Sequence, residues 1–125
     1  MLKIAVVGGC ASGKTTIVRE LRSRGLNAYV VGQEHSGVAG LWKHQEPDVL
    51  VFLYVELESV RARRDHNWPE WLYRTQQQRL QCAYEAASIR VNTSKLSVEQ
   101  ALTSILAGLP VGEDYEESPS SESPP

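Results

Sequence analysis

The sequence predicts an α/β domain built on a mostly parallel sheet of about four strands, and three observations lead to this fold class. Strand-like and helix-like segments alternate along the chain, as they do where helical crossovers join parallel strands. The segment 49–55 is apolar or aromatic at every position, which is typical of a strand covered on both faces of its sheet. A glycine-rich stretch, residues 8–15, lies between the first strand-like segment and the first helix-like segment.

The first half of the chain is predicted to hold two strands and one helix. An apolar run of strand length covers residues 2–7. Apolar residues that share one face indicate a helix over 14–24, and Gly25 is expected to end it. A second short strand is predicted over 27–31. The segment from 32 to 47 is predicted to be irregular because it holds three glycines and no clear period.

The second half is predicted to hold two strands and three helices. They cover, in order, residues 49–55, 58–64, 67–87, 88–92 and 97–107. Two of the helix starts carry a capping-box pattern, Asn67 with Glu70 and Ser97 with Gln100, in which two side chains cap the first turn reciprocally. Trp68 and Trp71, beside the first of these starts, are expected to pack onto the domain.

The chain is expected to divide into a domain over residues 1–109 and a tail over 110–125. The tail is rich in Pro, Ser and Glu, and residues 113–125 hold five acidic residues and no Lys or Arg. Such a segment buries too little apolar surface to offset its loss of chain entropy, so we expect it to be disordered. The remaining residues hold 13 basic and ten acidic side chains. This mildly basic balance suits an anionic ligand, but without a basic run we expect no nucleic-acid partner.

Composition also limits the compartment and the kinds of site. Cys10 and Cys82 form no disulfide framework, and no apolar run is long enough to span a membrane. The N-terminal apolar run is predicted to be a strand and not a signal peptide. We therefore expect a cytoplasmic protein without a membrane partner, and the sequence leaves its oligomeric state open. No His/Cys cluster has the spacing of a zinc site.

Residues 8–15, Gly-Gly-Cys-Ala-Ser-Gly-Lys-Thr, match the pattern G-x-x-x-x-G-K-[ST] of a phosphate-binding loop. Between a strand and a helix, such a loop points several backbone N–H groups into one nest beside the positive helix N-terminus. Lys14 is expected to reach the β- and γ-phosphates of a nucleotide, and the Thr15 hydroxyl to bind Mg²⁺. The residues predicted to bind the nucleotide here are Gly8, Ala11, Ser12, Gly13, Lys14, Thr15 and Thr16.

The domain resembles the small P-loop kinases of the nucleoside monophosphate, shikimate and adenylylsulfate kinase group. Besides the glycine-rich loop, three stretches carry the likeness. Residues 47–55, followed by Arg61, Arg63 and Arg64, look like the family's strand leading into its arginine-bearing lid. Residues 79–87 look like the helix that leads back to the sheet, and 89–97 like the last strand and the loop beside the adenine.

The resemblance implies a three-layer P-loop NTPase fold, with ATP and Mg²⁺ as cofactors and a small molecule as phosphoryl acceptor. It also implies that Thr93, Ser94 and Lys95 flank the adenine. The chain departs from the family in two respects. The family usually has five parallel strands, and its apolar strand ending in a metal-binding Asp is absent here, since the best strand is followed by Glu56 and Glu58.

Phosphoryl transfer depends on positioning and on neutralising charge more than on covalent help. By resemblance to lid arginines, Arg64 and either Arg74 or Arg79 are candidates for closing over the γ-phosphate; the alternative is a solvated basic face. Glu34 follows the second strand, at the sheet edge where ligands bind in doubly wound folds. It is a candidate for ordering Mg²⁺ or for accepting a proton from an acceptor hydroxyl. The predicted catalytic residues are Lys14, Glu34, Arg64 and Arg79, and the predicted metal residues are Thr15 and Glu34.

Three functions follow from these observations. The first is a minimal ATP-dependent phosphotransferase that acts on a small molecule. The second is a nucleotide-binding module with slow or no turnover whose bound state is recognised by a protein partner. The third is an interaction protein that retains the loop but makes no use of a nucleotide.

Overall fold

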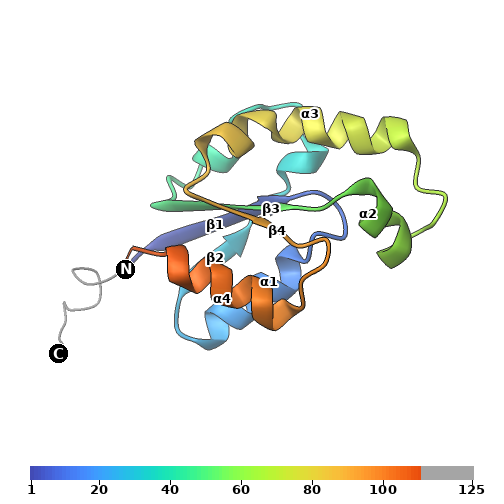
Figure 1. The fold of residues 1–125 in the computed structure, drawn as a ribbon. Helices are drawn as coiled ribbons and strands as arrows, with labels where there is room; N and C mark the ends of the chain where they lie inside the picture. The colour runs from blue at the N-terminus through green and yellow to red at the C-terminus, as the bar shows by residue number, and fades with distance from the viewer. Residues whose placement is uncertain (111–125) are drawn as a thin grey trace.

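A computed structural model describes residues 1–110, which form an α/β domain (Figure 1). The predicted tail lies outside the described residues, except for Pro110. Within residues 1–110, four strands form one sheet in the order β2-β1-β3-β4, and every neighbouring pair is parallel. The strands are β1 (Lys3–Gly8), β2 (Asn27–Val30), β3 (Val49–Tyr54) and β4 (Ile89–Asn92). The predicted α/β class and the predicted parallel sheet of about four strands are therefore confirmed.

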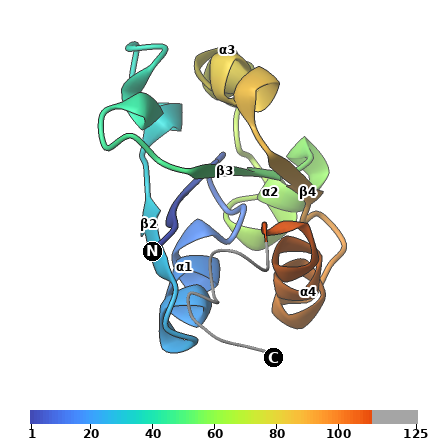
Figure 2. The ribbon, with the colours of Figure 1, turned by 90° about the vertical axis from the view of Figure 1, so that its left-hand side faces the viewer.

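The sheet is covered on both faces, which gives the domain three layers (Figure 2). Helices α1 (Lys14–Ser23) and α4 (Val98–Gly108) pack on one face, where Ile4 and Val6 point. Helix α3 (Glu70–Ala86) covers the other face, where Ala5 and Val7 point. Successive residues of β1 thus enter opposite cores, and this explains why the central strands are apolar at every position.

The segment predicted to be irregular is organised by one buried side chain. It contains two short 3₁₀ helices, η1 (Gln33–His35) and η2 (Leu41–Lys43), and lies on the same face of the sheet as α3. The Gln33 amide is fully buried; it donates to the Val38 carbonyl at 2.7 Å and accepts from the Trp42 amide at 3.2 Å. Trp42 in turn packs against the core beneath α3.

The structure contains two of the three helix caps that the sequence predicts. Gly25 adopts φ +83°, and the bonds from Gly25 N to Arg22 O and from Leu26 N to Leu21 O complete a Schellman motif after α1. Ser97 and Gln100 form the predicted capping box at the start of α4.

The capping box predicted for Asn67 and Glu70 does not form. Helix α3 begins at Glu70 with Pro69 as its N-cap, and the Glu70 carboxylate pairs with Arg74 instead of capping. Pro69 has extended backbone (ψ 136°), so the helix starts later than expected and Asn67 stays outside it. Trp71, on the first turn of α3, is 68 % exposed, which contradicts the expectation that it packs.

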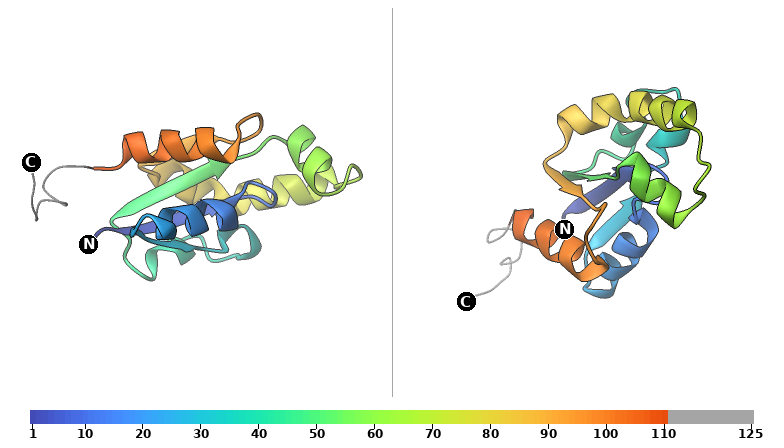
Figure 3. Two further views of the ribbon diagram at one scale, coloured as in Figure 1. Left: turned by 90° about the horizontal axis from the view of Figure 1, so that it is seen from below. Right: turned by 45° about the vertical axis from the view of Figure 1, so that its right-hand side comes forward.

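Helix α2 (Leu57–Arg63) lies beyond the carboxyl ends of the strands (Figure 3), where the connections β1–α1 and β2–η1 also lie. Three connections that are distant in the sequence therefore meet at one edge of the sheet. Among the described residues, no helix is both long and apolar enough to cross a membrane.

Tyr73 fastens the start of α3 to the end of β3 and gives the domain an expected alkaline sensitivity. Its hydroxyl donates to the Val55 carbonyl at 2.8 Å. Burial raises the pKa of Tyr73 well above its ordinary value of 10.0, and the Tyr54 hydroxyl and the charge of Glu56 raise it further. The folded state therefore holds the phenol proton more tightly than the unfolded chain does. The contribution of Tyr73 to the free energy of unfolding is fully present below pH 10 and is lost as the pH rises beyond it.

We expect Tyr73→Phe to cost about 1 kcal/mol at neutral pH, for one lost hydrogen bond. We also expect this variant to lose stability less steeply than the wild type above pH 10. Urea unfolding between pH 8 and 11 measures both effects, with Tyr84→Phe as a matched control that keeps the wild-type slope. Equal slopes for Tyr73→Phe and the wild type would contradict the assignment.

Candidate functional site

The connections at the carboxyl edge of the sheet surround a cavity of about 570 Å³, which we call the loop cavity. In parallel α/β sheets this edge is where ligands bind. The cavity is lined by the glycine-rich loop (residues 8–15) and the start of α1, by residues that follow β2, and by the end of α2. Of the predicted site residues, it brings together Ala11, Ser12, Gly13, Lys14, Thr15, Thr16, Glu34 and Arg64.

The glycine-rich loop leaves a row of backbone amides free. Ala11 and Gly13 have φ of +63° and +93°, and the Ser12 amide bonds back to the Gly9 carbonyl at 3.2 Å. Among residues 1–110, the amides from Gly13 to Thr16 have no hydrogen-bond acceptor. Together with the positive end of α1, they form a concave group of donors suited to an anion.

Gly8 determines how closely this loop approaches the sheet. A Cβ atom at Gly8 would lie 2.5 Å from the Leu53 carbonyl oxygen and 2.7 Å from Ser12 Oγ. Only glycine fits at this distance from β3. The loop therefore begins directly against the central strands, and its position depends on them.

Lys14 is held by its own loop and by Glu34. Its Nζ donates to the Gly8 and Gly9 carbonyls at 2.9 and 3.1 Å and lies 2.8 Å from Glu34 Oε2. The side chains of Lys14 and Glu34 are only 10 % and 4 % exposed. The ammonium is thus already positioned beside the free amides, and the buried carboxylate compensates its charge.

Glu34 has one carboxylate oxygen without a partner. Oε2 contacts Lys14 and lies 3.4 Å from His35 Nε2, whereas Oε1 is buried and accepts no hydrogen bond within residues 1–110. Arg79 does not line the loop cavity; its guanidinium donates to the Glu34 carbonyl at 3.2 Å. Arg79 therefore positions the η1 backbone instead of facing the cavity.

Arg63 is a site residue that the prediction did not include. It donates to the Ala11 carbonyl at 2.9 Å and to the carbonyls of Thr93 and Ser94, so it ties the glycine-rich loop to the β4–α4 connection. The Thr93 hydroxyl donates to the Ser12 carbonyl at 3.0 Å, which makes a second tie between the same segments. The cluster of Arg61, Arg63 and Arg64 was the available signal, but helical spacing alone does not show which member turns inward.

Beside Arg63 the loop cavity continues into a side hollow of about 340 Å³. The two spaces share the lining residues Ala11, Ser12, Gly13, Thr16 and Arg63. Of the three residues predicted to flank an adenine, Thr93 lines the side hollow, while Ser94 and Lys95 do not. Arg74 pairs with Glu70 at the surface, and Arg61 donates to the Trp68 carbonyl, so neither lines these spaces.

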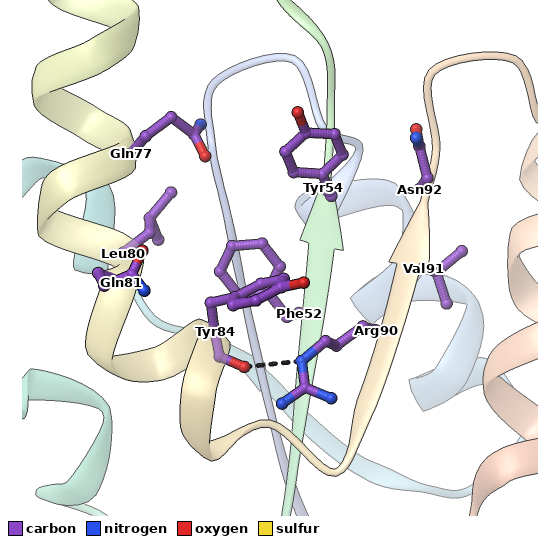
Figure 4. Close-up of a pocket in the computed structure, with 9 residues that line it drawn as sticks. All are labelled: Phe52, Tyr54, Gln77, Leu80, Gln81, Tyr84, Arg90, Val91 and Asn92. Atoms are coloured by element: carbon purple, nitrogen blue, oxygen red, sulfur yellow. Dashed lines mark hydrogen bonds between the residues drawn. The ribbon is translucent and has the colours of Figure 1, made fainter.

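A separate pocket of about 450 Å³ lies between α3 and β4 (Figure 4). Phe52 and Tyr84 meet edge to face in it, at 5.2 Å between ring centres, and Arg90 donates to the Tyr84 carbonyl at 2.7 Å. It contains none of the predicted site residues and shares no lining residue with the loop cavity.

Comparison of the chain with protein-family models and with curated proteins finds no match. The chemistry of the site is therefore inferred from its own residues.

Proposed function

We propose that this chain has a P-loop NTPase fold and binds ATP with Mg²⁺ as a minimal phosphotransferase, which transfers the γ-phosphate to a small molecule. The observation that carries the proposal is the row of free amides from Gly13 to Thr16, beside a positioned lysine and within a cavity. A carboxylate ligand would gain as much from the amides, but the side hollow adds space for a base and sugar next to a polyphosphate.

The residues present fit the phosphates of a nucleotide. The amides of the loop and the N-terminus of α1 would hold the β- and γ-phosphates, with the Lys14 ammonium as the charged donor. Lys14 has only to exchange its contact with Glu34 Oε2 for a phosphate oxygen, since its carbonyl contacts already orient it.

The residues also fit a magnesium ion. The Thr15 hydroxyl, which is exposed at the cavity, and the unpartnered Oε1 of Glu34 are oxygen ligands of the kind Mg²⁺ prefers, directly or through water. When bound, Mg²⁺–ATP supplies the transferable phosphoryl group. Glu34 thereby takes the place of the acidic residue that the family carries at the end of another strand, and it is the nearest candidate to accept the acceptor's hydroxyl proton.

Two arginines of α2 and its C-cap supply the remaining positive charge. Arg63 and Arg64 both line the loop cavity, as Glu34 does. A guanidinium can neutralise charge that develops on a transferring phosphoryl group, and its planar fork suits phosphate oxygens. In this proposal Arg64 faces the γ-phosphate. Arg63 ties the β4–α4 connection, on the side of the proposed base, to the glycine-rich loop.

The function is tested in two steps. Calorimetric titration with Mg²⁺–ATP is expected to show one site per chain. ADP release is then measured with and without fractions of a metabolite extract, and a fraction that raises the rate contains the acceptor. Absence of ATP binding at millimolar concentration would overturn the proposal at its first step.

A nucleotide-dependent binding module is the second candidate, and Trp71 favours it. This indole is 68 % exposed on the first turn of α3, soon after the arginines of α2, as an aromatic contact for a protein partner would be. Tight Mg²⁺–ATP binding without acceptor-stimulated ADP release would select this candidate.

Glu34→Gln tests the metal role by removing a charge while keeping the shape. The amide oxygen still accepts from Lys14, so we expect the fold to persist. The gain in ATP affinity that Mg²⁺ provides is expected to fall about tenfold, the worth of one charge-assisted contact. Calorimetry with and without Mg²⁺ measures this gain, and Glu20→Gln, on the surface of α1, is the matched control. An unchanged gain would contradict a metal role for Glu34.

A further inference from the structure

The fold brings Cys10, Glu34 and His35 together, although their spacing in the sequence is not that of a metal site. Their ligand atoms, the Cys10 thiol, a Glu34 carboxylate oxygen and a His35 ring nitrogen, all lie within 4.8 Å of one another. Cys10 follows β1 and the other two follow β2, so the pairing of these parallel strands creates the cluster. The expectation of no zinc-like cluster therefore applies to the linear sequence and not to the folded chain.

Two further observations support these three residues as metal ligands. Glu34 is 3 % exposed and its Oε1 is buried without a hydrogen-bond donor among the described residues. Such a group is costly unless something satisfies it, and a cation would do so. The buried amide of Gln76 donates to Cys10 Sγ at 3.4 Å and so orients the sulfur.

The donor set selects the ion. A thiolate and an imidazole with one carboxylate suit Zn²⁺, whereas Mg²⁺ and Ca²⁺ prefer oxygen ligands alone. Ligands of a tetrahedral zinc ion lie about 3.6 Å apart. The His35 ring already lines the loop cavity, and because its side chain is 63 % exposed it can rotate to close the remaining distance.

We propose that Cys10, Glu34 and His35 bind a Zn²⁺ ion, with Glu34 Oε1 as the oxygen ligand and a fourth position open to water. Cys10 gives up its thiol proton to solvent on binding, and the thiolate offsets one of the two charges of the ion. The Glu34 carboxylate is shared between the ion and the Lys14 ammonium, so the group keeps one net positive charge. Glu34 Oε2 stays with Lys14. With three protein ligands at a cavity wall, this is an open, exchangeable site and not a closed structural one.

The proposed zinc ion would take the same Glu34 oxygen, in the same cavity, as the Mg²⁺ of the proposed function, so its binding is tested on the full chain without nucleotide and without Mg²⁺. Co²⁺ is titrated first, because tetrahedral thiolate ligation gives a sulfur-to-cobalt charge-transfer band and intense visible bands. Zn²⁺ is then expected to displace Co²⁺ with a stoichiometry of one per chain. Failure of ATP binding would leave this result untouched, and failure of metal binding would leave the ATP site untouched.

Matched variants locate the ligands. Cys10→Ser is expected to abolish the charge-transfer band and to weaken Zn²⁺ binding at least about tenfold, and His35→Gln to weaken it by a similar factor. Cys82→Ser and His44→Gln, which change the same residue types outside the cluster, are expected to bind as the wild type does. A cobalt spectrum without the thiolate band, or equal Zn²⁺ affinity in Cys10→Ser and the wild type, would overturn the proposal.

Discussion

Replacing Lys14 with alanine is expected to weaken the binding of Mg²⁺–ATP by about tenfold or more. A charge-assisted contact in a partly desolvated site is worth about 1.5–3 kcal/mol, and Lys14 is the ammonium that the loop carbonyls hold beside the free amides. Calorimetry measures the change, and Lys43→Ala, outside the loop cavity, is the control.

The same substitution has a second effect that must be separated from the first. Removing Lys14 leaves the buried Glu34 carboxylate without its cation, and breaking such a pair destabilises a protein by several kcal/mol, about 3–5 when both partners are fully buried. The double variant Lys14→Ala/Glu34→Gln removes the stranded charge. We expect it to regain most of the lost stability in thermal unfolding but not the lost affinity. A folded Lys14→Ala protein with wild-type ATP affinity would refute the phosphate site.

Gly8→Ala is expected to lower the free energy of unfolding by about 3 kcal/mol, at the upper end of the cost of overpacking a core. The added methyl group would lie 2.5 Å from a backbone oxygen of β3, and a backbone atom of a central strand cannot move aside cheaply. The glycine-rich loop would be displaced along with Gly8, so ATP affinity is expected to fall as well.

The comparison is Gly37→Ala, where a Cβ atom meets nothing within 4 Å. This variant is expected to change stability by less than about 0.5 kcal/mol. Urea unfolding of both variants against the wild type distinguishes the two sites. If Gly8→Ala were as stable as Gly37→Ala, the close approach of the loop to β3 would be wrong.

Local features of the fold could be predicted because neighbouring residues determine them. The strand over 49–55 is apolar throughout, Gly25 can adopt positive φ, and Ser97 with Gln100 caps α4 within one turn. Each of these signals acts over a few residues, so the ends of the predicted and observed elements differ by at most three residues. The capping box wrongly predicted for Asn67 and Glu70 also has a local cause, because Pro69 is extended and α3 starts after it.

The candidate site was predictable only in part. The glycine-rich loop follows from its pattern, and Glu34 follows from its place after a strand. The role of Arg63 did not follow, because its partners Ala11, Thr93 and Ser94 lie 30 or more residues away. Likewise, the 2.8 Å contact between Lys14 and Glu34 depends on β1 and β2 being neighbours.

The amino-acid sequence by itself thus determined an α/β domain with a glycine-rich loop between its first strand and first helix, because periodicity, caps and turns depend on short-range contacts. Only the tertiary structure decided the strand order, the inward turn of Arg63, the buried pairing of Lys14 with Glu34 and the meeting of Cys10 with His35. These contacts form where the carboxyl ends of parallel strands converge. That convergence depends on which strands pair, which no local segment of the chain specifies.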